Sequence, residues 1–186
     1  MSRVSTIKMT ARQFQQLGED PPGVRLELVD GEIAVSPSPV PDHGYAVVAL
    51  AALLKQHIDS NDLGMLLPDV DTIFGEHDVR RPDLFYFRKS RLHFIGDKAI
   101  HGPPDLCIEV ISPGSERIDR RDKFKQYAAG TVRHYWIVDP RQKTIEAYDL
   151  RGRKYVGRVR GSGSDVVSLP PFSKLRIPLA KLWRPK

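Results

Sequence analysis

The chain has 186 residues, 40% hydrophobic and 28% charged, which is the composition of a soluble globular protein with one well-buried core. Its formal net charge of +6 favours an anionic partner, nucleic acid first, although many basic proteins bind none. A single cysteine excludes a disulfide within the chain, and the lack of a secretory segment or of roughly 20 consecutive apolar residues predicts a cytoplasmic protein without a membrane span.

The first elements expected are a short helix and a β-hairpin. Gln13 follows Thr10 at capping-box spacing, which predicts a helix that begins after Thr10. The run VRLELVDGEIAV predicts two strands joined at Asp30-Gly31, because this dipeptide favours tight hairpin turns. Strand alternation puts Glu27 on the same face as Arg25, and this pattern alone favours a Glu27 side chain in water.

A second helix is expected after the proline-rich connector at residues 36–41. Asp42 is placed to cap it, and the helix should run from about His43 to Ile58. Its body, YAVVALAALL, is apolar on nearly every side, which predicts a helix buried between layers. His43 in the first turn can reach an anion or a site at the helix start, but a lone histidine there is more often structural.

The middle of the chain is expected to contain two short strands. Residues 64–74 and 79–87 carry the strand pattern, and the polar loop 75–78 separates them. His77-Asp78 in this loop can be imagined as a pair of metal ligands, but such pairs are common in loops. The basic stretch 88–102 is expected to be a loop with a short helix, placed to lie against a nucleic-acid backbone.

The chain is organised around residues 103–139. The apolar run Leu106 to Ile111, between a proline pair and a Ser-Pro-Gly turn, predicts a buried central strand. A helix over 118–129 and a strand over 135–138 complete a βαβ unit with parallel strands. A carboxylate inside a buried strand is costly unless it is paired or binds a cation, so Glu109 marks a place where chemistry is expected.

The end of the chain is expected to contain one more strand, KTIEAYDL, and a short amphipathic element. Between them lies the basic run RGRKYVGRVRG, residues 151–161. It predicts either a solvated hairpin or an arm that faces phosphate groups, and the residues alone do not decide between the two.

Acidic and basic side chains around the central strand form a candidate site. Asp83 would lie beside Glu109 if their two strands pair, and two such carboxylates repel each other unless a cation lies between them. Oxygen ligands alone select Mg²⁺ or Mn²⁺. Asp119, Lys123 and Tyr127 are spaced i, i+4, i+8 and form one polar stripe on the expected helix. Taken alone, this stripe is more often a solvated face with an ion pair.

An ordered set of motifs resembles a known family. RPDLFYF, PPDLCIEVISP, HYWIVDP and the Asp119/Lys123/Tyr127 pattern are similar to the Uma-type restriction-endonuclease-like family of the PD-(D/E)XK nuclease superfamily. LELVDGE, SPSPVPDH and the closing LPPFSKLRIPLAKLW extend the likeness over nearly the whole chain. The resemblance implies a single restriction-endonuclease-like domain over residues 1–186, with an α/β core in which helices flank a mixed β-sheet.

The resemblance also implies a metal site. Asp83 and Glu109 would be the paired acids, and they would hold Mg²⁺ together with the carbonyl group of Val110; Mn²⁺ would substitute. The lysine usual two residues after the second acid is missing, because Ile111 stands there. In similar families the next helix supplies this lysine, which here is Lys123.

Three further residues are implied near the site. Glu27 would be an auxiliary acid, which reverses the solvent-facing placement that alternation favours. His43 matches a family histidine close to the site, and Tyr127 would be a further auxiliary residue.

The implied activity is Mg²⁺-dependent hydrolysis of phosphodiester bonds by an endonuclease. The expected substrate is DNA, bound mainly through its phosphate backbone. Cutting two strands with one site per chain predicts a homodimer. Two alternatives stay open: a catalytically inactive nucleic-acid-binding module of the same fold, and a structural protein whose acids form ordinary ion pairs. The intact Asp83/Glu109/Lys123 set argues against the inactive module, because a lapsed enzyme would be free to lose a member.

Overall fold

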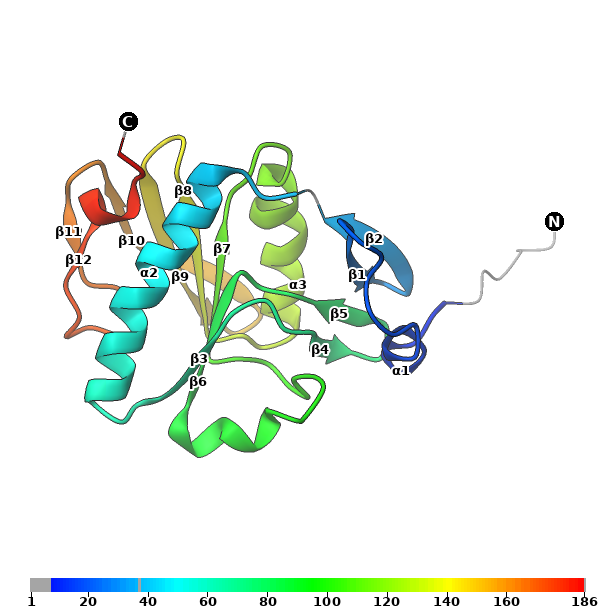
Figure 1. Ribbon diagram of the computed structural model, residues 1–186. Coiled ribbons are helices and arrows are strands. Elements are labelled where there is room, and N and C mark those ends of the chain that lie inside the picture. Colours follow the sequence, from blue (N-terminus) through cyan, green and yellow to red (C-terminus); the bar gives the residue numbers. More distant parts are fainter. Residues whose placement is uncertain (1–7, 37, 186) are drawn as a thin grey trace.

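The structure is a computed structural model that describes residues 8–36 and 38–185, so Pro37 of the expected connector lies outside the described residues. A six-stranded sheet forms its centre (Figure 1). The strand order in this sheet is β10 (Lys154–Ser162), β9 (Thr144–Arg151), β8 (His134–Asp139), β7 (Leu106–Val110), β6 (Leu84–Arg88) and β3 (Gly64–Leu67). Since β7 runs parallel to β8 and antiparallel to β6, the sheet is mixed, as expected.

Two smaller sheets complete the strands. The first has the order β2 (Glu32–Ser36), β1 (Arg25–Val29), β5 (Asp78–Arg80) and β4 (Thr72–Gly75). It extends from one side of the central sheet (Figure 1). The second is a pair of very short strands, β11 (Val166–Val167) and β12 (Ile177–Pro178), near the end of the chain.

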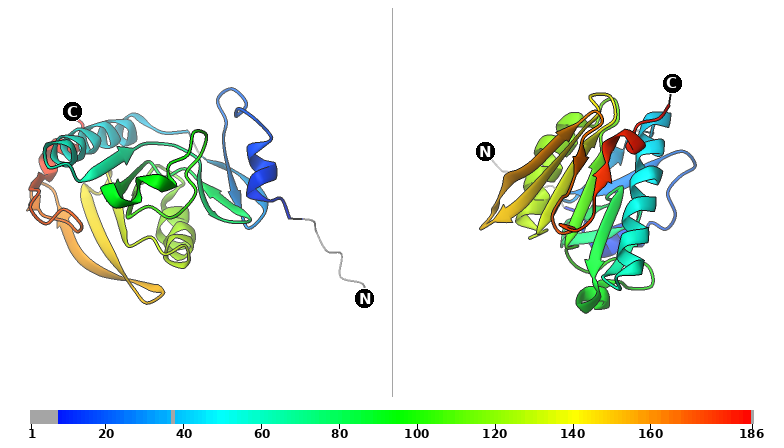
Figure 2. Two further views of the ribbon diagram at one scale, coloured as in Figure 1. Left: turned by 90° about the horizontal axis from the view of Figure 1, so that it is seen from below. Right: turned by 90° about the vertical axis from the view of Figure 1, so that its left-hand side faces the viewer.

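Helices cover both faces of the central sheet (Figure 2). The long helix α2 (Pro41–Ser60) packs on the face that carries the even-numbered residues of β7, such as Ile108. The other face carries Cys107 and is covered by residues 118–129, where a π-helical turn (Ile118–Lys123) continues into α3 (Phe124–Ala129). The expected α/β core, with helices flanking a mixed sheet, is therefore confirmed.

The expected local signals at the start of the chain are also confirmed. Helix α1 (Ala11–Gln15) begins at a capping box, in which the Thr10 side chain accepts from the Gln13 backbone and the Gln13 side chain accepts from the Thr10 backbone. The hairpin of β1 and β2 turns at Asp30 and Gly31, whose φ angles are +50° and +80°. Two successive residues with positive φ are what a tight two-residue hairpin turn requires.

The burial and the start of α2 differ from expectation. The helix begins at Pro41 after Val40, and Asp42 lies in its first turn, paired with Arg184 instead of capping the backbone. Only one stripe of the helix is buried, while Val48 on the opposite side is 70% exposed. The expectation of burial between two layers was wrong because no described residue packs over the outer face, and folded proteins tolerate exposed apolar side chains of this kind.

The two strands expected in residues 64–87 are four strands in two different sheets. Pro68 ends β3, and Pro82 separates β5 from β6. Proline has no N–H group and cannot continue a ladder inside a sheet, so at each proline the chain crosses from one sheet to the other. The second crossing leaves Asp83 at the junction of the two sheets.

The remaining expectations concern the basic segments and membrane spans. Residues 89–94 form a short 3-10 helix, as expected within 88–102. The basic run 151–161 forms the turn and second strand of the β9–β10 hairpin, while its contact with phosphate stays a prediction. Near the end of the chain Leu179–Leu182 forms a further 3-10 helix. Within the part of the chain that the structure describes, no helix combines the length and apolar character needed to cross a bilayer.

The one-sided burial of α2 predicts unequal effects of two truncations. Leu54→Ala should lower the free energy of unfolding by about 2–5 kcal/mol, because it leaves a cavity beside the central sheet. Val48→Ala should change it by less than about 0.5 kcal/mol, because this side chain is mostly exposed. Equilibrium urea unfolding measures both values, and equal losses for the two variants would contradict the packing described.

Candidate active site

A small cavity lies where the four-stranded sheet meets the central sheet. Asp83 directly precedes β6, and the register that pairs Leu84 with Ile108 brings Asp83 opposite Glu109 of β7. The cavity has a volume of about 70 Å³. Polar residues from β1, β2, β5, α2, β7 and the π-helical turn line it: Arg25, Glu27, Ser36, His43, Arg80, Asp83, Glu109, Asp119 and Lys123. The expected proximity of Asp83 to Glu109 is thus present in the structure.

Asp83 is buried and contacts a backbone N–H group, a histidine and an arginine. Its Oδ2 accepts a hydrogen bond of 2.8 Å from the Val110 backbone N–H and lies 3.1 Å from Nε2 of His43. Oδ1 lies 3.8 Å from Nη1 of Arg25. Burial alone would raise the pKa of Asp83, but the hydrogen bond and charge of His43 outweigh it, so the pKa lies below its ordinary value.

Glu109 is 2% exposed and lies in the middle of the core. Its Oε2 accepts a hydrogen bond of 2.8 Å from Nζ of Lys123, and its Oε1 accepts one of 2.6 Å from the hydroxyl of Tyr127. Burial raises the pKa of Glu109 to about 8; the charge of Lys123 opposes this shift, and the neighbouring carboxylates Asp83 and Asp119 add to it.

Lys123 is the ammonium group shared by the surrounding acids. Besides Glu109, its Nζ lies 3.6 Å from Asp119 and 3.9 Å from Glu27. Burial would lower the pKa of Lys123, but these carboxylates outweigh burial and raise the pKa above its ordinary value. Lys123 is therefore protonated at neutral pH.

The polar stripe on this helix faces inward. Asp119, Lys123 and Tyr127 are all buried, and all three lie next to Glu109 or to one another. The alternative of a solvated helix face is therefore wrong. The physical reason is that Glu109 offers both its oxygens to the stripe, so the buried polar groups of the helix find partners inside the core.

Glu27 is buried as well, with 3% of its surface exposed. Its Oε2 accepts a hydrogen bond of 2.9 Å from Nη1 of Arg80 and one of 3.2 Å from the Ser36 hydroxyl. Its Oε1 accepts a hydrogen bond of 2.9 Å from the Arg81 backbone N–H. Burial opposes ionisation, yet the charges of Lys123 and Arg80 lower the pKa of Glu27 to about 2. The solvent-facing placement was wrong because this face of the hairpin covers the cavity.

Sequence reasoning overlooked two charged residues of the cavity. Arg80 is almost fully buried and forms an ion pair with Glu27. It also donates a hydrogen bond of 2.6 Å to the side chain of Gln126. The side chain of Arg25 is 25% exposed and forms ion pairs with Asp69 and Asp83. It also donates a hydrogen bond to the backbone carbonyl of Arg81. The position of Arg80 directly before the Arg81-Pro82-Asp83 motif is a signal that could have marked it.

The loop pair His77-Asp78 makes structural contacts near the β1–β2 hairpin. Nδ1 of His77 lies 2.8 Å from the carbonyl of Met9, and Asp78 accepts from the Asp30 backbone and from Gln126. Among the described residues, no three His, Cys, Asp or Glu side chains are arranged to hold a metal ion. A metal in the cavity would therefore rely on two carboxylates at most, with backbone oxygen and water as further ligands.

The donor set of the cavity fits Mg²⁺ on this basis. Mg²⁺ typically binds one or two carboxylates and keeps several of its waters. Asp83, Glu109 and Val110 all line the cavity. Burial raises the pKa of Glu109 and the carboxylates of Asp83 and Asp119 add to this, so a bound cation would favour the charged form of Glu109.

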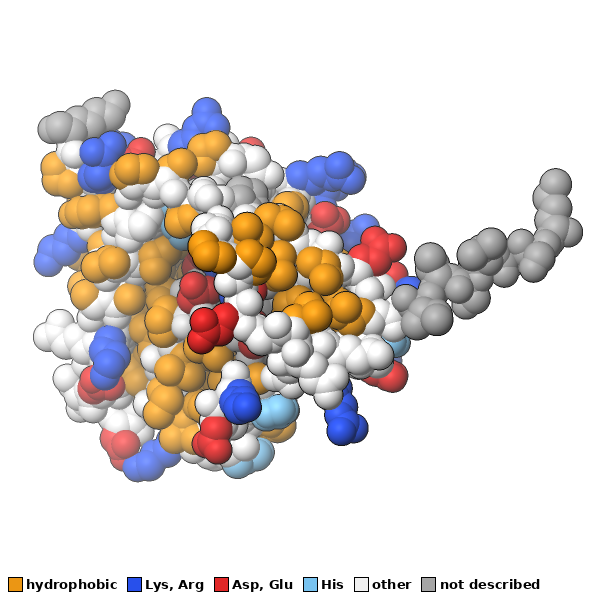
Figure 3. Space-filling model, turned by 45° about the vertical axis from the view of Figure 1, so that its right-hand side comes forward, with side chains coloured by type: hydrophobic (Ala, Val, Ile, Leu, Met, Phe, Trp, Pro, Cys, Tyr) orange, Lys and Arg blue, Asp and Glu red, His pale blue; other side chains and the backbone are white. Residues whose placement is uncertain are grey.

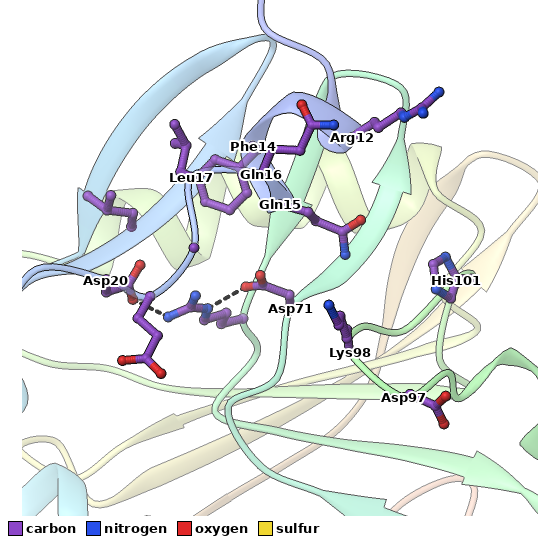
Figure 4. Close-up of a pocket in the computed structure, with 14 residues that line it drawn as sticks. Arg12, Phe14, Gln15, Gln16, Leu17, Asp20, Asp71, Asp97, Lys98 and His101 are labelled. Atoms are coloured by element: carbon purple, nitrogen blue, oxygen red, sulfur yellow. Dashed lines mark hydrogen bonds and ion pairs between the residues drawn. The ribbon is translucent and has the colours of Figure 1, made fainter.

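A larger cavity of about 910 Å³ lies between α1 and the loop that contains Lys98 and His101 (Figure 4). None of the candidate acids lines it. Ion pairs of Arg81 with Asp20 and Asp71 form part of its wall and appear as dashed lines in Figure 4. Glu27, Glu109 and Lys123, whose pKa values are strongly shifted, all line the small cavity, so the chemistry is expected there despite its size.

Comparisons with known proteins agree with the fold. Residues 11–180 match a family described as "Uma2: Putative restriction endonuclease". The crystal structure of a "putative nuclease belonging to DUF820" from Anabaena variabilis superposes with a TM-score of 0.77. It is 20% identical in sequence, and the match covers 94% of this chain and 97% of that chain, which shows a shared fold. No curated protein matches the chain.

The lowered pKa of Glu27 predicts a pH-dependent contribution to stability. An unfolded-state value near 4.5 and a folded value of about 2 mean that the ionised group contributes about 3 kcal/mol above pH 4.5, and that this is lost as the pH falls toward 2. Glu27→Gln should therefore destabilise the protein at pH 7, and its difference from the wild type should shrink on acidification. Urea unfolding between pH 7 and pH 3.5 measures this difference.

The matched control is Glu32→Gln. Glu32 lies exposed on the neighbouring strand, so its substitution should leave the unfolding free energy nearly unchanged at every pH. A Glu27→Gln penalty that stays constant across the range would mean that the ionisation of Glu27 contributes nothing to folding.

Proposed function

The chain belongs to the Uma2 family, and we propose that it is a Mg²⁺-dependent endonuclease that hydrolyses phosphodiester bonds in DNA. The family inferred from the motifs is thereby confirmed, and membership supports a nuclease function. The observation that carries the proposal is the convergence of Asp83, Glu109 and Lys123 on one buried cavity, with shifted pKa values.

In this proposal Asp83 and Glu109 hold Mg²⁺ together with the Val110 carbonyl group, and Mn²⁺ can substitute. The bound ion would supply a water of lowered pKa and would offset charge on the phosphate. The Val110 N–H and His43 fix the orientation of Asp83, while the Tyr127 hydroxyl fixes that of Glu109. His43 and Tyr127 are thus positioning residues for the two acids.

Lys123 acts as a hydrogen-bond donor and a fixed positive charge. Because its pKa is raised, it cannot take a proton from water near neutral pH. It can orient the attacking water or stabilise the negative charge that develops on the phosphate oxygens. Glu27, ionised and bound to Arg80, keeps the ammonium of Lys123 within the cavity.

A catalytically inactive nucleic-acid-binding module of the same fold is the second candidate. What favours it is the direct contact of Lys123 with Glu109, which partly compensates the acid without a metal ion. A thermal shift with Mn²⁺ or Mg²⁺ separates the two functions. A metal-binding site raises the melting temperature by mass action, whereas an inactive module that binds no metal shows no such change.

Substitutions of the lysine and the second acid should separate their roles. Lys123→Ala and Lys123→Met should each lower the single-turnover cleavage rate by about 10² to 10⁴-fold while metal-dependent stabilisation persists. Both should also destabilise the fold, because buried carboxylates lose their cation; Lys123→Met keeps the packing of the methylene groups. Glu109→Gln should abolish cleavage and weaken the thermal shift with Mn²⁺, because it removes a negative ligand.

Lys125→Ala is the control for these variants. Lys125 lies exposed two residues along the same helix, so its loss should leave rate and metal response unchanged. A folded Lys123→Met protein that cleaves at the wild-type rate would remove Lys123 from the mechanism, and the binding-module alternative would then be preferred.

The basic hairpin predicts that DNA binding weakens steeply with salt. If about six phosphates are neutralised, the affinity should fall by about a thousandfold between 50 and 200 mM salt, because bound counterions are released. Arg153→Gln and Lys154→Gln, both at exposed positions of residues 151–160, should each reduce the slope by about one. Fluorescence anisotropy in the presence of EDTA measures these values. A flat salt response would argue against nucleic acid as the partner.

A further inference from the structure

The outer edge of the small sheet has unpaired backbone groups. Strand β2 forms this edge and pairs only with β1 among the described residues. In a hairpin with a two-residue turn, alternate residues exchange backbone hydrogen bonds within the pair, starting with Val29 and Glu32. The N–H and C=O groups of Ile33 and Val35 therefore point away from β1. No backbone hydrogen bond from another described residue reaches them.

This edge lacks the features that usually protect edge strands. Natural edges carry proline, an inward-pointing charge, lysine or a bulge. Residues 32–36 contain no proline or lysine, and their pairing with β1 is regular. Ile33 is 47% exposed and Val35 is 65% exposed. Hydrophobic side chains gather on the face of the molecule that includes this side (Figure 3). Within residues 8–36 and 38–185 the edge is therefore both open and apolar.

We propose that β2 pairs antiparallel with β2 of a second copy of this chain, about a two-fold axis at Ala34. The sequence Glu-Ile-Ala-Val-Ser supports a second copy as the partner, because it reads polar, β-branched, small, β-branched, polar in both directions. An interface between identical patches must be self-complementary in this way. An unrelated strand would not require this symmetry.

The register about Ala34 satisfies the open groups. Ile33 lies opposite the partner's Val35, and each of the two such pairs exchanges two backbone hydrogen bonds. Their β-branched side chains face each other across the new strand boundary, an arrangement that stabilises sheets. Glu32 lies opposite the partner's Ser36, so no like charges meet. The four-stranded sheets of the two copies thus join into a single sheet of eight strands.

The pairing places the two candidate sites on one side of the joined sheet. A two-fold axis between antiparallel strands is perpendicular to the sheet, so the Glu27 face of both copies points the same way. Glu27 is paired with Ala34 in register. From Glu27 to the partner's Glu27 there are then three strand spacings of roughly 4.8 Å, about 14 Å in all.

This separation suits the two strands of one duplex, a step that rests on the proposed function. The major groove of B-DNA is about 12 Å wide, so two cavities whose Glu27 residues lie about 14 Å apart on a common face can address phosphates on opposite strands. The proposal therefore specifies the substrate as duplex DNA cut on both strands by a pair of chains.

Sedimentation equilibrium tests the interface independently of activity. The wild-type protein should have twice the chain mass of 21.0 kDa at micromolar concentration. Ile33→Lys, which places a charge on the edge, should have the mass of one chain and stay folded, with an unfolding temperature lowered only by the loss of the contact between copies. The control Val48→Lys alters a similarly exposed apolar residue on α2 and should keep the doubled mass. A wild-type protein of single mass, or an Ile33→Lys protein of doubled mass, would overturn the proposal.

Hydrogen exchange and plasmid cleavage complete the test. The amides of Ile33 and Val35 should exchange slowly in the wild type and faster on dilution, and exchange that does not depend on concentration would also overturn the interface. With Mn²⁺, the wild type should linearise supercoiled plasmid while Ile33→Lys mainly nicks it. Absence of cleavage by every protein would count against the proposed function alone, because mass and exchange decide the interface.

Discussion

The burial of one carboxylate constrains the rest of this structure. Glu109 lies inside a strand with neighbours on both sides, where an unpaired charge would cost several kcal/mol. Lys123 and Tyr127 each donate a hydrogen bond to one of its oxygens, so the helix that carries them must pack on this face of the sheet. Lys123 in turn attracts Glu27, and this draws the hairpin of the small sheet over the cavity.

Two acids of the same cavity have opposite pKa shifts, which divides their roles. Glu27 receives two charge-assisted or backbone hydrogen bonds from the Arg80–Arg81 segment, and its pKa falls to about 2. Glu109 has a single lysine to set against burial and two neighbouring acids, and its pKa rises to about 8. A fully compensated carboxylate gains little from a further cation, whereas an undercompensated one gains much. In the proposed function Glu109 is therefore the acid that would gain from a metal ion, while Glu27 lies 3.9 Å from Lys123 and holds the lysine.

How much of this could be predicted depends on the range of the interactions. The turn at Asp30-Gly31 and the strand around Glu109 follow from local patterns, because neighbouring residues determine turn geometry and strand burial. The approach of Asp83 to Glu109 followed once the two strands were assumed to pair. The burial of Glu27 could not be predicted from alternation, since it depends on one sheet packing against another. The exposed outer face of α2 could not be predicted for the same reason, because composition does not show whether another element packs over a helix.

The crossing between the sheets shows why site and fold are not separable here. Arg80, the last residue of β5, binds Glu27 within the small sheet, while Asp83 binds the Val110 N–H of the central sheet three residues later. The intervening Pro82 ends one ladder before the other begins. The charged residues that line the cavity thus also make the contacts that hold the two sheets together. A protein built in this way cannot lose its acidic cluster and keep the junction intact, so the cluster would persist for structural reasons even in a chain that no longer cleaved. An intact set of acids alone is therefore weak support for catalysis.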